Sequence, residues 1–223
     1  MVIYASIQPI DGPRQTLAES GPCLYANIPG HGLMPVLGLM KFDDADIAFI
    51  TGAGSFEEVI VHEMLHVLGF GTFWNDAQLG GTRHLLADSG TATPSFTGAQ
   101  ARQGCLNVGG TITCATAVPV EGNSAGPGTA DSHWRESVFQ KELMTGFINS
   151  SPNPLSSVTI GSLADLSYVV NAADFDDYAL PPGSAPALRA NIVVAPSDGW
   201  ERLRSMQDMW MLVGGQARKV RPQ

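Results

Sequence analysis

Residues 55–70 read SFEEVIVHEMLHVLGF, and the interpretation of the whole chain starts from this stretch. Ser55, followed three residues later by Glu58, predicts a capping box at the start of a helix. Apolar residues then recur at helical spacing as far as Leu68, and Gly69 is typical of a helix C-terminus. We therefore expect an amphipathic helix that begins directly after Ser55 and ends at Leu68.

Within this helix, His62-Glu63-Met64-Leu65-His66 forms an H-E-x-x-H motif. Residues four apart lie on one helix face, so both imidazoles can reach one metal ion. Zn²⁺ accepts such nitrogen ligands, and Glu63 is then placed to act on a water at the metal. The alternative is a pair of helical histidines without a metal. Gly69 disfavours it, because a glycine lets the chain turn away so that a third ligand can come from beyond the helix.

The third ligand does not follow the short metzincin pattern, because the residue three positions after Gly69 is Thr72 rather than histidine. The other histidines of the chain are His31, His84 and His133. The first two are isolated among loop residues and are interpreted as ordinary surface histidines. Met144 follows His133 by eleven residues, and a methionine on a tight turn beneath the metal is a metzincin feature.

On these residues the chain resembles the leishmanolysin family of metzincin peptidases, and in particular its cysteine-poor bacterial-type members. The matching stretches are His62–Phe70, Ser132–Glu136 and Glu142–Met144. The resemblance implies that His62, His66 and His133 hold one zinc ion per chain. It also implies that Glu63 is the general base and that Met144 forms the Met-turn.

The resemblance further implies an α+β, metzincin-type catalytic domain over residues 1–182. Its upper lobe, about residues 1–69, would carry a twisted mixed sheet and the active-site helix, and its lower lobe, residues 133–182, would be mainly irregular or helical. Strand-like patterns support the sheet at residues 2–7, 23–28 and 35–42. The family insertion would cover residues 70–132, with a short helix near Ala99–Gln103. Residues 183–223 are expected to form a C-terminal extension of unknown role.

The activity implied by the resemblance is that of a zinc-dependent endopeptidase, which hydrolyses peptide bonds of proteins through a metal-activated water. An extended substrate would pair with an edge strand of the sheet. By position, the nominated edge consists of Cys23, Leu24, Tyr25, Ala26, Asn27 and Ile28. One alternative is a catalytically inactive zinc-binding or protein-binding module on the same fold, which the retained Glu63 disfavours. A structural zinc domain is the other, and the absence of paired C-x-x-C spacing disfavours it.

The composition excludes several other classes of partner. The chain has 223 residues with 12 Lys and Arg against 21 Asp and Glu, a net charge of −9 that argues against nucleic-acid binding. No run of eighteen apolar residues is present, so we expect no transmembrane segment. No signal peptide is visible, so either the protein is cytosolic or its start has been trimmed, and the strand-like start favours trimming. The resemblance implies a secreted or cell-surface protein, and we expect a monomer.

Two further predictions concern cysteines and aspartates. Cys105 and Cys114 flank a glycine-rich stretch, which predicts a short disulfide-closed loop. Cys23 is then left over and is interpreted as a buried small hydrophobic residue. Candidate Ca²⁺ ligands are Asp43, Asp44 and Asp46, and Asp174, Asp176 and Asp177. Solvated turns or helix caps are the favoured interpretation of both aspartate groups.

Overall fold

The computed structural model describes residues 1–171, 173–182, 209–213 and 216–220 of the chain. These residues fall into two compact units. The first unit holds residues 1–84 and the two C-terminal strands, and the second holds the described residues from 85 to 182. In the described part of the chain, no helix is long and apolar enough to cross a membrane.

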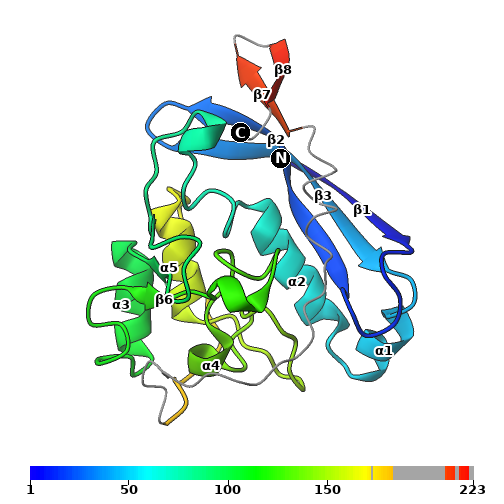
Figure 1. Cartoon of the computed structure of the whole chain (residues 1–223), viewed down its shortest axis with the longest axis vertical. Coiled ribbons are helices and arrows are strands. Elements are labelled where there is room, and N and C mark those ends of the chain that lie inside the picture. The colour runs from blue at the N-terminus through cyan, green and yellow to red at the C-terminus, as the bar shows by residue number, and fades with distance from the viewer. Residues whose placement is uncertain (172, 183–208, 214–215, 221–223) are drawn as a thin grey trace. The chain divides into compact units, whose positions relative to one another are not determined.

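The first unit is built on a five-stranded mixed sheet (Figure 1). Its strands are β1 (Val2–Gln8), β2 (Ala18–Ile28), β3 (Gly32–Asp43), β7 (Met209–Val213) and β8 (Gln216–Val220). They lie in the order β1-β3-β2-β7-β8, with β3 parallel to β1 and antiparallel to β2. β7 pairs in parallel with residues 24–26 of β2 and antiparallel with β8. The C-terminal hairpin therefore extends the sheet.

The three predicted strands are confirmed, and all of them are longer than predicted, the first by a single residue. The second strand begins at Ala18 rather than at residue 23, although Gly21 and Pro22 are unusual inside a strand. The structure accommodates them at a register shift between Pro22 and Leu24. Since β7 pairs with residues 24–26, β2 is not the edge of the sheet at these positions. This long-range pairing was not expected from the sequence.

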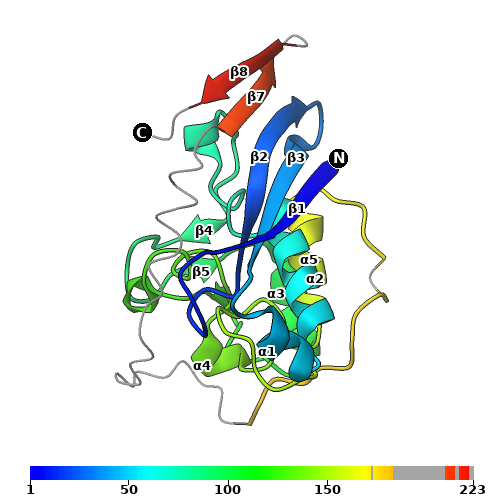
Figure 2. The ribbon, with the colours of Figure 1, turned by 90° about the vertical axis from the view of Figure 1, so that its right-hand side faces the viewer.

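Two helices follow the sheet strands, α1 (Ile47–Gly52) and α2 (Phe56–Val67). α2 lies against the sheet in both views (Figures 1 and 2). The close approach requires Gly38 on β3, because a Cβ there would collide with the Val67 side chain. A hydrogen bond also joins β2 to α2, because the Ser20 hydroxyl donates to the backbone carbonyl of Glu63 at 2.8 Å. These contacts fix the face of α2 that carries the H-E-x-x-H motif.

The predicted helix is confirmed, but its predicted cap is wrong. Ser55 is the N-cap residue, yet its side chain makes no capping hydrogen bond. Its hydroxyl instead donates to the carbonyl of Ile50 at 3.3 Å. The reason is that α1 ends only three residues before Ser55, so the Ile50 carbonyl near its C-terminus is within reach and also accepts from the Ser55 N–H at 3.0 Å.

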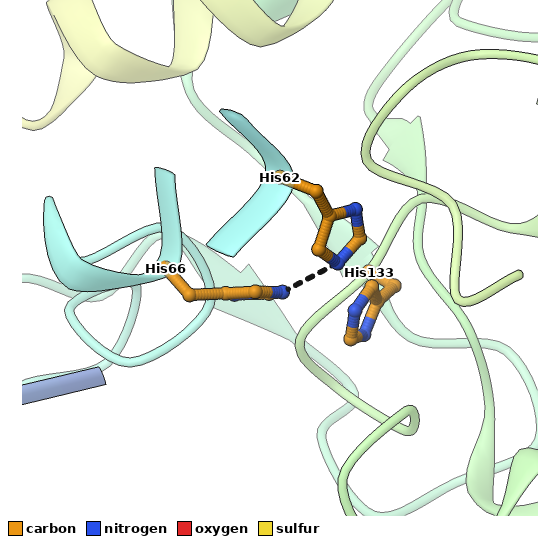
Figure 3. Close-up of side chains that lie close together, drawn as sticks. All are labelled: His62, His66 and His133. Carbon is orange, nitrogen blue, oxygen red and sulfur yellow. Dashed lines mark hydrogen bonds between the residues drawn. The ribbon is translucent and has the colours of Figure 1, made fainter. Parts of the chain in front are cut away.

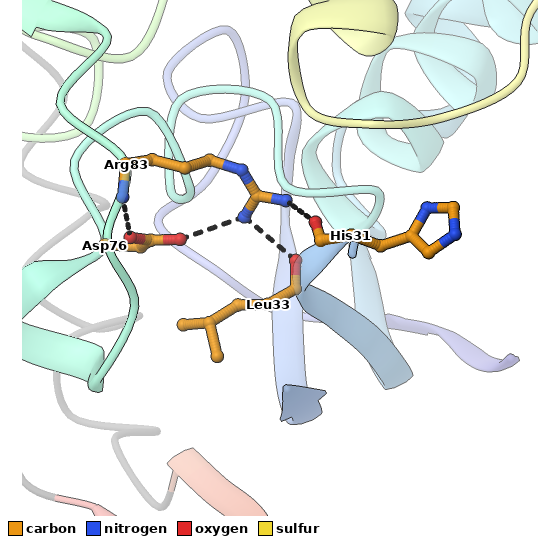
Figure 4. Close-up of polar contacts among 4 residues, drawn as sticks. All are labelled: His31, Leu33, Asp76 and Arg83. Atoms are coloured by element: carbon orange, nitrogen blue, oxygen red, sulfur yellow. Dashed lines mark hydrogen bonds and ion pairs between the residues drawn. The ribbon is translucent and has the colours of Figure 1, made fainter. Parts of the chain in front are cut away.

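Arg83 fastens the segment after α2 to the turn between β2 and β3 and to the start of β3, and an ion pair with Asp76 holds its side chain (Figure 4). Arg83 Nη1 lies 2.9 Å from Asp76 Oδ2 and donates to the Leu33 carbonyl at 3.0 Å, while Nη2 donates to the His31 carbonyl at 2.5 Å. Asp76, fully buried, also accepts from the Arg83 backbone N–H at 2.6 Å. Asp76 directly precedes a short 3₁₀ helix, η1 (Ala77–Leu79). Because the buried charges are paired and hydrogen-bonded, this contact can hold the segment in place.

The second unit combines helices with a small antiparallel sheet. Its elements are β4 (Leu86–Ala87), β5 (Ser95–Phe96), α3 (Ala99–Asn107), β6 (Val118–Pro119), η2 (Asn123–Ala125), α4 (Glu136–Phe139) and α5 (Ser157–Asp165). α3 and α5 lie side by side (Figures 1 and 2). They approach closely because Gly104 and Gly161 face the partner helix, where a Cβ would collide with its backbone. The helix expected near Ala99–Gln103 is thus confirmed and continues to Asn107.

Trp134 is the centre of the core of this unit. Its ring is fully buried and packs edge-on against Phe96, with ring centroids 5.6 Å apart. It also packs against Phe139 in a tilted arrangement at 6.0 Å. The predicted disulfide between Cys105 and Cys114 is confirmed, with Cα atoms 6.2 Å apart.

The α+β class is confirmed by the mixed sheet and helices. Cys23, in the first unit, carries a free thiol and is half-buried rather than buried. The units divide between His84 and Leu85, and the lobes proposed from the sequence, divided at residues 69 and 133, stay predictions.

Candidate metal centre

His62 and His66 lie one turn apart on α2, and their side chains converge (Figure 3). The two Nε2 atoms are 3.0 Å apart. Nδ1 of His66 lies 3.1 Å from the carbonyl oxygen of Phe70. A carbonyl can only accept, so Nδ1 carries the proton and Nε2 of His66 is left with its lone pair directed toward His62. The i, i+4 spacing therefore brings the two candidate ligand nitrogens together.

Gly69 creates the hydrogen bond that orients His66. Its φ of +99° belongs to the left-handed region, and a Cβ there would collide with the Phe73 ring. The chain reverses at this residue, with the Phe70 N–H donating to the Leu65 carbonyl at 3.1 Å. The turn brings the Phe70 carbonyl back to His66. The glycine predicted to end the helix thus also determines the protonation pattern of a candidate ligand.

Glu63 is buried on the same helix, with 6% of its surface exposed. Burial raises the pKa of Glu63 to about 7; the Ser20 hydroxyl opposes the increase and the charge of Glu19 adds to it. Its Oε2 atom is buried and has no hydrogen-bond partner among the described residues. A carboxylate with one unpaired oxygen and a pKa near neutrality is suited to accepting and returning a proton.

His133 belongs to the second unit and is also buried. Its Nδ1 lies 3.2 Å from the Thr129 carbonyl and 3.0 Å from the Ser132 hydroxyl. The Ser132 hydroxyl already donates to the Gly128 carbonyl at 2.7 Å, so it accepts from His133. Both partners therefore require a proton on Nδ1, and Nε2 keeps its lone pair.

His62, His66 and His133 form the single group of three or more candidate metal ligands in the described part of the chain. Each offers one nitrogen, and these nitrogens all lie within 4.8 Å of one another (Figure 3). A family model described as Leishmanolysin matches residues 1–179. The chain belongs to the leishmanolysin family. None of the curated proteins matches the chain closely enough to count as a relative. The leishmanolysin family is one of metallopeptidases, and the three histidines are able to bind a metal ion.

The donor set of this leishmanolysin-family chain fits zinc. Catalytic zinc sites usually have three protein ligands and keep a further position open. Imidazoles that bind zinc commonly donate their other ring N–H to a carbonyl or carboxylate, as His66 does to Phe70 and His133 to Thr129. The unpaired Oε2 of Glu63 is a second feature that fits, because a buried polar atom normally has a partner.

The aspartates proposed for calcium do not form such a group in the described part of the leishmanolysin-family chain. Asp43 instead accepts backbone N–H groups of Asp11, Gly12 and Ala45, at 2.9 to 3.1 Å. These hydrogen bonds lower the pKa of Asp43, although burial itself opposes the decrease. Asp176 accepts from the Leu155 N–H at 2.8 Å. Both residues therefore act as acceptors in turns, as the favoured interpretation held, but Asp43 is buried rather than solvated.

The remaining histidines of the leishmanolysin-family chain are also as expected. His31 and His84 are both exposed, and neither belongs to the candidate ligand group. Sequence reasoning missed Glu142, a buried carboxylate two residues before Met144. Nothing in its spacing distinguishes it from a surface glutamate, and only an apolar neighbourhood around Leu143 and Met144 hinted at burial.

Proposed function

We propose that this chain is a zinc-dependent endopeptidase that hydrolyses peptide bonds in proteins. In this proposal His62, His66 and His133 hold one zinc ion per chain, and Glu63 is the general base and acid. The observation that carries the proposal is the unpaired, buried Oε2 of Glu63, directly beside His62 in sequence and on the same helix. Met144 is proposed to form the Met-turn and not to bind the metal.

Bound zinc would polarise the scissile carbonyl and make a water more acidic. Glu63 removes one proton from that water as its oxygen adds to the carbonyl carbon. Glu63 then delivers the same proton to the departing amide nitrogen, so that the C–N bond breaks to give an acid and an amine. Its raised pKa supports both halves of this cycle, since a group with pKa about 7 exchanges protons readily near neutral pH.

The substrate is proposed to lie extended along residues 23–28 of β2. The backbone of residues 24–26 pairs with β7, so a substrate strand would have to replace β7 there. Residue Tyr25 is fully buried and does not offer its side chain to a substrate. The family supports protein substrates, and we propose a secreted or cell-surface monomer without nucleic-acid partners.

Replacing Glu63 by Gln tests this function. The three imidazoles stay in place, so we expect zinc to remain bound while peptide hydrolysis falls by at least about a hundredfold, the lower range for one general acid–base group. Turnover of a mixed peptide library by zinc-loaded protein is the measurement, and chelation followed by zinc addition is the control. Near-normal turnover by the variant would show that Glu63 is not the base. A zinc-loaded wild type that cleaves nothing would favour the inactive binding module.

A further inference from the structure

Glu142 is a buried carboxylate in the second unit that the proposed reaction does not use. Oε1 of Glu142 accepts from the Ser156 N–H at 3.2 Å, the Ser156 hydroxyl at 2.7 Å and the Thr159 hydroxyl at 2.6 Å. Its Oε2 accepts from the Met144 N–H at 2.6 Å. One buried side chain therefore joins the start of α5 to the turn that carries Met144.

The proton positions in this network are determined by its outer members. The Ser156 hydroxyl accepts from the Val158 N–H at 3.2 Å, so its own proton is available for Glu142. The Thr159 hydroxyl accepts from the Trp134 indole N–H at 2.8 Å, so its proton is directed to Glu142 as well. The other two donors to Glu142 are the backbone N–H groups of Ser156 and Met144, which can only donate. All four contacts therefore require Glu142 to be an acceptor on both oxygens.

Glu142 reaches the residue next to His133 by two routes. The first runs through Thr159, which binds both the carboxylate and the Trp134 ring. In the second, Glu142 holds the Met144 N–H, and the Met144 carbonyl accepts from the Trp134 N–H at 2.9 Å. The backbone and ring of Trp134 thus both depend on this carboxylate. Because His133 directly precedes Trp134, its backbone cannot shift without disturbing one of these bonds.

We propose that Glu142 is a positioning residue that holds His133, together with the turn at Met144, in the arrangement needed for metal binding. The inference rests on the proposed function only in taking His133 as a zinc ligand. Glu142 does not belong to the candidate ligand group. Its effect is on the orientation of a ligand, which in metal sites typically changes affinity by 10- to 100-fold when an outer partner is lost.

Glu142→Gln is the sharpest test, because it keeps the shape of the side chain. The amide oxygen can keep the three donors of Ser156 and Thr159, and the NH₂ group then faces the Met144 N–H, so that two donors oppose each other. We expect zinc affinity, measured by chelator competition, to fall 10- to 100-fold. The absorption bands of the Co²⁺-loaded protein should also shift, since they report ligand geometry.

Asp165→Asn is the matched control. Asp165 accepts backbone N–H groups of Gln100 and Ala101 at 2.9 to 3.1 Å, in the same unit, but within the described residues it makes no hydrogen bond to Trp134 or Met144. Loss of the Asp165 carboxylate should lower the melting temperature of the metal-free protein. Zinc affinity should stay within about twofold of the wild type, a much smaller change than the loss of a group that orients a metal ligand. Thr159→Val should weaken zinc binding, and Thr159→Ser should restore it by returning the hydroxyl.

Zinc affinity of wild-type strength in Glu142→Gln would overturn the proposal, as would equal losses in Glu142→Gln and Asp165→Asn. If Glu142→Gln does not fold, the two Thr159 variants provide the test. Weak zinc binding by Thr159→Val together with wild-type zinc binding by Thr159→Ser supports the inference. Equal zinc binding by the two variants overturns it. A wild type that binds zinc but cleaves no peptide removes the proposed function alone. A wild type that binds no zinc removes both.

Discussion

The Nε2 atoms of His62 and His66 lie 3.0 Å apart on successive turns of α2. Two nitrogens bound at 2.0–2.1 Å to one tetrahedral ion are separated by roughly 3.3 Å, so a small side-chain adjustment suffices for both to bind it. Nε2 of His66 keeps its lone pair, so in the metal-free chain it accepts a hydrogen bond from Nε2–H of His62. A metal ion can take the place of the proton in that hydrogen bond. The helix therefore presents this pair ready for a metal ion, and the third ligand becomes the question to test.

His133→Ala is expected to weaken zinc binding by more than about 100-fold, beyond the loss typical of an outer partner, because a direct ligand disappears. Elemental analysis of the wild type should give one zinc per chain. His84→Ala is the control, since His84 is exposed and lies outside the candidate ligand group. A larger loss with His84→Ala than with His133→Ala would mean that the third ligand has been assigned to the wrong residue.

Glu63→Gln should change the pH dependence of stability in the metal-free protein. Burial raises the pKa of Glu63 to about 7 from an ordinary value of 4.5. The stabilising contribution of protonated Glu63 is therefore fully present below pH 4.5. It is lost as pH rises through 7, because the folded state must then bury a charge. The difference between these two pKa values corresponds to roughly 3 kcal/mol of unfolding free energy. Glutamine does not titrate, so the variant should become progressively more stable than the wild type across this range.

Urea unfolding of both metal-free proteins between pH 4.5 and pH 8 measures the difference in unfolding free energy. Glu57→Gln, at an exposed position in the first turn of the same helix, serves as control and should follow the wild-type profile. The H-E-x-x-H motif alone predicts an exposed cleft carboxylate with little influence on stability, and the burial of Glu63 corrects that prediction. Parallel profiles for Glu63→Gln and the wild type would contradict the raised pKa.

Removal of the disulfide should destabilise the second unit moderately. Cys105 and Cys114 are nine residues apart, and closing a loop of this size restricts the unfolded chain by roughly 2–3 kcal/mol. The double variant Cys105→Ala with Cys114→Ala should lose that amount in urea unfolding, and reductant should produce the same loss in the wild type. Cys23→Ala should leave the reductant effect intact. A wild type insensitive to reductant would count against the bond.

Shortening the chain to end at residue 208 should lower KM for extended peptides, because the backbone of residues 24–26 then loses β7 as a partner. The turnover number should change little, since Glu63 and the histidines are retained. A chain ending at residue 220, which keeps both β7 and β8, is the matched control. Equal KM values for the two chains would show that substrate does not pair with residues 24–26.

The features predicted correctly from the sequence are those encoded within a few residues. The H-E-x-x-H helix follows from its period and its terminal glycine, and the disulfide follows from two cysteines around a short loop. The capping interaction failed because α1 offers Ser55 a competing carbonyl, and the end of α1 cannot be read from the motif alone. His133 could be nominated only through family resemblance, since its distance from the motif encodes no geometry.

The features missed by sequence reasoning depend on contacts between distant segments. Arg83 binds the carbonyls of His31 and Leu33, about fifty residues earlier, and no pattern at Arg83 indicates this. Glu142 resembles any charged residue until Thr159 and Ser156 are brought against it. Burial of a charged group depends on partners supplied by the whole fold, and these partners are invisible to local periodicity.

The pairing of β2 with β7 has a consequence for the synthesis of the protein. Leu24 pairs with Trp210, so the sheet of the first unit is completed only after the whole second unit has been translated. At typical translation rates of 5–20 residues per second, the intervening chain takes roughly 10 to 40 seconds to emerge. During that interval β2 presents unpaired N–H and C=O groups to the crowded surroundings of the ribosome, where another nascent chain can pair with them. Slower translation lengthens this exposure, and faster completion shortens it.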